Sequence, residues 1–129
     1  MKMFVFIFII FNITVFSQNF SQSDLIGTWL YVKYDPFSLK PPDVANFTFS
    51  DSLDFSKAQI IFKEDGHYIY KYAGNVEENK FSLDGNKLTL YYSSSVSRSY
   101  NVMRLDNEYL VTLYNEKMFD EYTYYKRIK

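Results

Sequence analysis

Few side chains in this 129-residue chain could carry out acid–base or nucleophilic chemistry. The chain has one histidine, His67, and no cysteine, which excludes disulfides, thiolate metal sites, cysteine nucleophiles and multi-histidine metal cages. His67 follows Gly66 in a turn sequence, and no motif supplies the partner that a catalytic histidine needs. We therefore expect His67 to be an ordinary surface side chain.

Acidic residues occur as the adjacent pairs Glu64-Asp65, Glu77-Glu78 and Asp120-Glu121. Paired carboxylates carry out acid–base catalysis when one of them is buried, but these pairs lie at turns or alternate across strands. Asp51 and Asp54 are close in sequence, yet the glycine and distal glutamate of a calcium-binding loop are missing. We predict that the protein is not an enzyme, with no catalytic residue, no metal site and no cofactor.

Tyrosine is the residue type that points to binding. The chain has 13 tyrosines beside 13 phenylalanines and one tryptophan. Each tyrosine offers a large apolar surface with a polar tip, which suits a partly polar, flat or cyclic ligand. The predicted ligand-lining residues are Tyr68, Tyr70, Leu88, Leu90, Tyr122 and Tyr124.

Plain packing of a sheet by these tyrosines is the alternative. A second set of tyrosines has the opposite phase and cannot all point inward as well: Tyr31, Tyr91, Tyr114 and Tyr125. Aromatic side chains clustered outside would suit contact with a protein or a glycan. The net charge of −1 gives no basic surface for nucleic acid.

Short β-strands must position these residues. Turn sequences such as Asp84-Gly85-Asn86 separate runs rich in β-branched and aromatic residues. The predicted strands are Thr28–Tyr34, Ala58–Phe62, His67–Tyr72, Glu77–Leu83, Lys87–Tyr92, Ser97–Leu105, Glu108–Tyr114 and Phe119–Ile128. Short turns between consecutive strands predict an antiparallel meander, and closure into a barrel hides its edges best. The predicted fold class is an all-β, eight-stranded, up-and-down antiparallel barrel.

One connection, from Asp35 to Lys57, is far longer than the others. Loops of this length usually have a function or are mobile. This loop carries six large apolar side chains, which a solvated loop would not need. Four of them are predicted lid residues over a cavity mouth: Phe47, Phe49, Leu53 and Phe55. The alternative is an ordered loop that completes the core.

The N-terminal segment has a different composition from the rest of the chain. Residues 1–17 place Lys2 before an apolar run of about 14 residues, with Val15 and Ser17 as small residues before a cleavage point. The run is shorter than the roughly 20 residues of a membrane-spanning helix. We predict a signal peptide over 1–17, cleavage before Gln18, and one domain over 18–129. The protein would be exported, periplasmic or secreted, and would meet a membrane only through this segment.

Three motifs resemble one family. The sequence Leu25-Ile26-Gly27-Thr28-Trp29 resembles the Gly-x-Trp signature that opens the first strand of lipocalins and related calycin barrels. Phe62 to Gly66 and Leu83 to Leu88 resemble further motifs of short lipocalin-like domains exported by Bacteroidetes-type bacteria. The resemblance implies a structural brace of Gly27, Trp29 and Arg127, in which Arg127 packs across Trp29 and Lys126 is the alternative.

The expected function is non-catalytic binding of a small apolar or amphipathic ligand inside a lipocalin-like barrel. The alternative is an interaction module for a protein or glycan, with an interior filled by side chains. A cavity of roughly 300 Å³ or more would favour the first interpretation.

Overall fold

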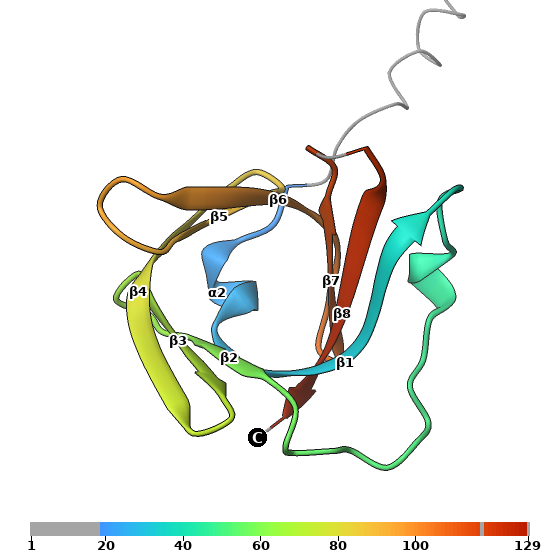
Figure 1. The fold of residues 1–129 in the computed structure, drawn as a ribbon, viewed down its shortest axis with the longest axis horizontal. Helices are drawn as coiled ribbons and strands as arrows, with labels where there is room; N and C mark the ends of the chain where they lie inside the picture. Colours follow the sequence, from blue (N-terminus) through green and yellow to red (C-terminus); the bar gives the residue numbers. More distant parts are fainter. Residues whose placement is uncertain (1–18, 117, 129) are drawn as a thin grey trace, which may run out of the picture.

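The computed structural model describes residues 19–116 and 118–128. Its eight strands are β1 (Gly27–Ser38), β2 (Gln59–Phe62), β3 (His67–Tyr72), β4 (Asn75–Asp84), β5 (Lys87–Tyr91), β6 (Ser97–Leu105), β7 (Tyr109–Tyr114) and β8 (Asp120–Ile128). Each strand pairs with the next and β8 pairs with β1, which closes the barrel (Figure 1). The predicted all-β meander barrel is confirmed. The predicted signal peptide lies outside the described residues.

The hairpins follow from their turn residues. Ala73 and Gly74 alone separate β3 from β4, and both have positive φ angles, 54° and 84°. A two-residue hairpin of type I′ requires positive φ at both central positions, which glycine adopts without steric cost. The two-residue turn between β4 and β5 differs, because Gly85 has a positive φ of 66° and Asn86 does not, which is the type II′ pattern with glycine at the first central position.

A short helix closes one end of the barrel. Helix α2 (Gln22–Leu25) begins with a capping box, in which Ser21 and Asp24 satisfy each other's backbone N–H groups. Leu25, at the end of α2, is fully buried in the main core cluster together with Trp29 and Phe62. Figure 1 shows α2 within the ring of strands, so the chain seals this end before it enters β1.

A bulge in β1 changes which residues face inward. The pairing of β1 with β8 skips one residue between Tyr31 and Lys33. Val32 packs against a buried cluster on the outer face of the barrel, which we call the outer cluster and which comprises Val111, Leu113, Tyr122 and Tyr124. The Lys33 ammonium lies 5.1 Å from the centroid of the Tyr124 ring, on the same outer face. Two consecutive residues therefore share the outer face, and Tyr34 follows Tyr31 into the interior.

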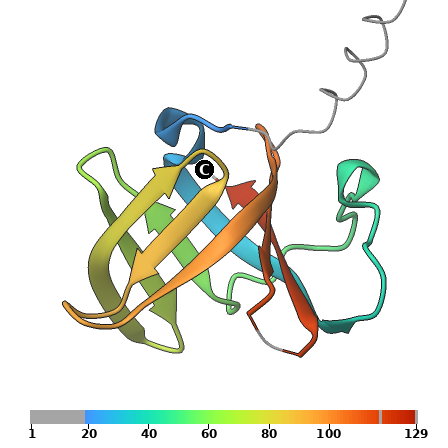
Figure 2. The same ribbon diagram turned by 90° about the horizontal axis from the view of Figure 1, so that it is seen from above.

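The long segment between β1 and β2 packs on the outer wall of the barrel. Val44, in the 3-10 helix η2 (Val44–Asn46), and Phe47 contact the outer cluster. Figures 1 and 2 both place the part of this segment around η2 on the side of β1 and β8, away from β4 and β5. Strand β7 is apolar on both faces because the barrel interior covers one face and this segment covers the other.

Candidate functional site

The closed end of the barrel is held by a side chain from the last strand. The guanidinium carbon of Arg127 lies 4.2 Å from the Trp29 ring centroid. Arg127 donates hydrogen bonds to the carbonyl oxygens of Ile26 (2.8 Å), Asp24 (2.7 Å) and Asn107 (3.1 Å). These bonds satisfy carbonyls at the end of α2 and in the β6–β7 turn, while the indole nitrogen of Trp29 donates to the carbonyl oxygen of Leu25 at 2.9 Å. Arg127, rather than Lys126, lies over Trp29.

Gly27 leaves the space that Arg127 occupies. Its φ of 140° lies in a region that other residues rarely adopt. A Cβ atom at Gly27 would lie 2.6 Å from a terminal nitrogen of Arg127. Glycine is therefore required here both by backbone conformation and by the close approach of the guanidinium group.

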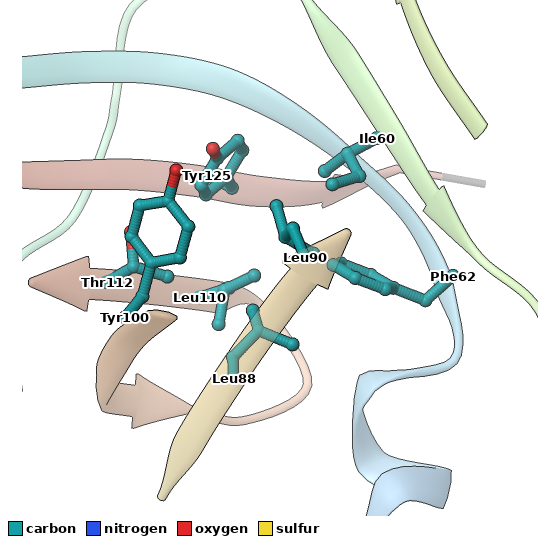
Figure 3. Close-up of a pocket in the computed structure, with 8 residues that line it drawn as sticks. All are labelled: Ile60, Phe62, Leu88, Leu90, Tyr100, Leu110, Thr112 and Tyr125. Atoms are coloured by element: carbon teal, nitrogen blue, oxygen red, sulfur yellow. The ribbon is translucent and has the colours of Figure 1, made fainter. Parts of the chain in front are cut away.

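Above this end, apolar side chains almost fill the barrel. A small cavity of about 10 Å³, too small for an organic ligand, lies among side chains from five strands. Figure 3 shows these side chains. The lining residues of the cavity are Ile60, Phe62, Leu88, Leu90, Tyr100, Leu110, Thr112 and Tyr125. The leucines gather beside Phe62, and the hydroxyl-bearing rings of Tyr100 and Tyr125 adjoin them. This layer is the floor of the space above it.

The other end of the barrel contains a cavity of about 550 Å³. Eight tyrosines form most of its wall: Tyr31, Tyr34, Tyr68, Tyr70, Tyr92, Tyr100, Tyr114 and Tyr125. Ala58, Ile60, Leu90 and Thr123 complete the uncharged lining. Three charged residues also line it, namely Glu77, Arg98 and Glu121. We call this space the mouth cavity.

Polar contacts fix several of the mouth-cavity tyrosines. The Tyr68 hydroxyl donates to the carbonyl oxygen of Tyr91 at 3.0 Å, and the Tyr34 hydroxyl donates to Glu121 at 3.2 Å. The hydroxyls of Tyr92 and Tyr100 form a hydrogen bond of 3.2 Å. These bonds set ring orientation, so the cavity walls are largely formed before any ligand enters.

Burial keeps the deeper tyrosines protonated. Desolvation by burial, its largest cause, raises the pKa of Tyr68 to about 12. Burial also raises the pKa of Tyr125, and it raises the pKa of Tyr100, where the hydrogen bond with Tyr92 adds to the effect. These hydroxyls therefore stay neutral near pH 7 and can donate hydrogen bonds.

The structure brings together four of the six predicted ligand-lining residues. Tyr68, Tyr70 and Leu90 line the mouth cavity, and Leu88 lies in the floor beneath it. The sequence analysis did not predict Arg98 or six tyrosines of the wall, which are Tyr31, Tyr34, Tyr92, Tyr100, Tyr114 and Tyr125. Three of these six, Tyr31, Tyr114 and Tyr125, belong to the tyrosine set of opposite phase.

Tyr122 and Tyr124 lie outside the barrel, unlike the prediction. They are buried in the outer cluster, and the Tyr124 ring centroid lies 4.4 Å from that of Phe47. Alternation groups residues by face but does not say which face is inside. One signal was available, because Arg127 was expected inside over Trp29. Counting back by twos from Arg127 places Tyr125 inside and Tyr124 outside.

The predicted lid residues do not cover the mouth cavity, because none of the four is among its lining residues. Phe47 packs against Tyr124 and Tyr109, and the backbone N–H of Phe49 donates to the Tyr109 hydroxyl at 2.7 Å. Leu53 is half-buried. Phe55 is 59% exposed and lines an outer groove with residues of β3 and β4. Val44 and Phe47 of this segment pack on the outer wall instead.

Across 19–116 and 118–128, no three or more His, Cys, Asp or Glu side chains are grouped to hold a metal ion. Over the same ranges, no helix is long and apolar enough to cross a membrane. His67 lies outside the mouth cavity, with its Nδ1 atom 3.3 Å from Asp65.

Comparison with known proteins identifies the family. Residues 25–112 match the family described as a lipocalin-like domain, which is more than half of the chain. No curated protein and no solved structure matches the chain. The matched region contains the Gly27 and Trp29 motif and most of the closed meander barrel. On this match and this architecture, the chain belongs to the lipocalin-like domain family.

Proposed function

We propose that this protein is an exported, non-catalytic binding protein that holds one small apolar or amphipathic molecule in the mouth cavity. The observation that carries the proposal is the cavity itself, about 550 Å³ at one end of a closed barrel. Ligand pockets for small molecules typically span roughly 300–1,000 Å³. Export rests on the signal-peptide sequence of residues 1–17.

The wall chemistry suits an amphipathic ligand. Tyrosine rings together with Leu90 and Ile60 supply apolar surface, and burial of a ligand's apolar area against them supplies affinity. The hydroxyls of Tyr92 and Tyr100 supply polar contacts at a defined place on the wall. A ligand with a flat or cyclic body and a polar group would use both kinds of surface.

Two observations favour this function over an interaction module with a filled barrel. The side-chain filling stops at the floor, and the mouth cavity above it is open. Tyr122 and Tyr124, on the outer face, are buried and so cannot serve as an exposed aromatic patch.

A probe titration with a cavity-filling variant tests the proposal. We expect N-phenyl-1-naphthylamine, a neutral aromatic probe, to bind the purified protein with a rise in probe fluorescence. Ala58 lines the mouth cavity, and Ala58→Trp should weaken probe binding at least about tenfold by occupying the space. The matched control is Ala45→Trp, because Ala45 is exposed in η2 outside the barrel. Equal binding by both folded variants would place the probe elsewhere and reject the mouth cavity as the site.

A further inference from the structure

Arg98 is a cation in the aromatic wall of the mouth cavity. It lies on β6 and is half-buried, and its guanidinium carbon is 4.4 Å from the Tyr114 ring centroid. Within the part of the chain that the structure describes, no carboxylate lies within 4.0 Å of its guanidinium nitrogens. The Tyr114 ring face and the neighbouring Tyr100 hydroxyl both interact with the guanidinium group, which has five N–H donors and so keeps donors for a ligand. Such donors suit an oxyanion, which they bind by two parallel hydrogen bonds.

The hydroxyl groups next to Arg98 add donors to the same wall. Tyr92 and Tyr100 share one hydrogen bond, so one of the two O–H protons remains available to a ligand. The Tyr100 ring lies 5.8 Å from the Tyr114 ring on which Arg98 stacks, which places the hydroxyl pair and the guanidinium on one wall. Tyrosine is protonated near neutral pH, and burial raises the pKa of Tyr100 further, so its hydroxyl group can donate.

The acidic residues of the cavity lie toward its rim. Glu77 is exposed and pairs across the sheet with Tyr70. Glu121 pairs across the sheet with Tyr114 and accepts the hydrogen bond from the exposed Tyr34. Both carboxylates would repel a bound anion, so an anionic group is favoured only where Arg98 outweighs them. Neutralising Glu121 and neutralising Arg98 should therefore change anion affinity in opposite directions.

We propose that the wall formed by Arg98, Tyr92 and Tyr100 binds the anionic group of the ligand, so that the ligands of this barrel are amphipathic organic anions. The apolar body lies against Leu90, Ile60 and the remaining tyrosine rings, and a carboxylate or sulfonate meets the guanidinium group. This inference rests on the proposed binding function and names the chemical class of its ligand.

Two probes with the same ring skeleton test the inference. The anionic probe is 8-anilinonaphthalene-1-sulfonate, and the neutral probe is N-phenyl-1-naphthylamine, which lacks the sulfonate. Arg98→Gln should weaken the anionic probe about tenfold, the size expected for a lost charge-assisted hydrogen bond. Binding of the neutral probe should change less than about twofold. Glu121→Gln should strengthen the anionic probe by about two- to fivefold relative to the neutral probe.

A surface variant controls for net charge. Lys87 is exposed on β5, so Lys87→Gln removes the same charge as Arg98→Gln without touching the cavity, and it should change neither probe. If Arg98→Gln does not fold, salt dependence in the unmodified protein decides the question. Raising ionic strength should weaken the anionic probe and spare the neutral one.

The outcomes separate the two proposals. Suppose that Ala58→Trp weakens binding of both probes but that Arg98→Gln affects the two probes equally. The anion site is then rejected and the binding function stands. If Arg98→Gln does not fold, an equal response of the two probes to salt leads to the same conclusion. If Ala58→Trp displaces neither probe, the mouth cavity is not a binding site, and both proposals fail.

Discussion

At the scale of single residues, Arg127 links parts of the chain that are distant in sequence. It spans the Trp29 ring and bonds carbonyls on both sides of the closed end, from Asp24 to Asn107. Its neighbour Lys126 points outward, with its ammonium group 4.9 Å from the Tyr109 ring. Adjacent basic residues on one strand thus have different tasks, because successive side chains alternate between the faces of the sheet.

Arg127→Ala should lower the free energy of unfolding by about 1–3 kcal/mol, since it removes hydrogen bonds to carbonyls and packing over Trp29. Lys126→Ala is the matched control and should cost less than about 1 kcal/mol, because it removes one cation–π contact. Chemical denaturation followed by Trp29 fluorescence measures both. Equal losses in the two variants would contradict the brace.

At the scale of elements, the segment between β1 and β2 is a strap on the outer wall. Phe47 packs against Tyr109 and Tyr124, and Arg104 donates to the carbonyl oxygens of Val44 (3.0 Å) and Phe47 (2.8 Å). The guanidinium of Arg104 is itself held by Asp106 at 2.7 Å. These contacts tie the strap to β6, β7 and β8, so it contributes to stability and not to closure of the mouth cavity.

Phe47→Ala should therefore lower the free energy of unfolding by about 2–4 kcal/mol and leave probe affinity unchanged, because it opens a void in the outer cluster. Phe55→Ala is the control, since the Phe55 side chain is 59% exposed, and should change stability by less than about 0.5 kcal/mol. Denaturation and N-phenyl-1-naphthylamine titration of the same samples measure both properties. A large loss of probe affinity in a stable Phe47→Ala variant would restore the lid interpretation.

At the scale of the whole molecule, packing and backbone hydrogen bonds hold the barrel together without any disulfide. The closing pair, β1 with β8, runs from Thr28 and Ile128 at one end to Ser38 and Asp120 at the other. Aromatic side chains pack on both faces of this strand pair, those of the cavity wall on the inner face and those under the strap on the outer face. Because so many tyrosines are protonated and buried in this arrangement, folding is coupled to pH in the alkaline range.

We expect stability to fall as pH rises above about 10, where tyrosine ionises in the unfolded chain. Tyr68 keeps its proton in the folded state up to about pH 12, so the unfolded state releases its proton first and is stabilised relative to the folded state as pH rises. Below about pH 10 both states are protonated and the contribution is fully present. Denaturation across this range, with phenolate absorbance as the titration signal, measures the effect.

Tyr68→Phe is the matched control for that titration. It should flatten the decline between about pH 10 and about 12 by up to about 1.4 kcal/mol per pH unit, because one linked proton is removed. The decline that remains reports other groups, including Tyr100 and Tyr125. An identical decline in Tyr68→Phe and in the unmodified protein would show that Tyr68 titrates normally when folded.

The sequence by itself determined the strands, their order and their closure. Two-residue turns such as Ala73-Gly74 make the strands on either side antiparallel neighbours. Such turns need positive φ, which glycine adopts most readily, so they are visible in the sequence. The strand segments therefore matched closely, with β1 longer than predicted and β4 starting at Asn75 rather than Glu77. The motif around Gly27 and Trp29 pointed to the family that residues 25–112 match.

Only the tertiary structure decided which residues face the mouth cavity. Alternation has a period of two, so it is equally satisfied when every side chain of a strand is turned to the other face. A local pattern also cannot reveal the bulge that brings Tyr34 inward after Tyr31. Tyr122 and Tyr124 look like cavity residues in sequence, but they lie on the outer wall, where Phe47, more than seventy positions earlier, covers them. A cavity is the space left between strands far apart in the chain, and its lining depends on closure of the whole barrel.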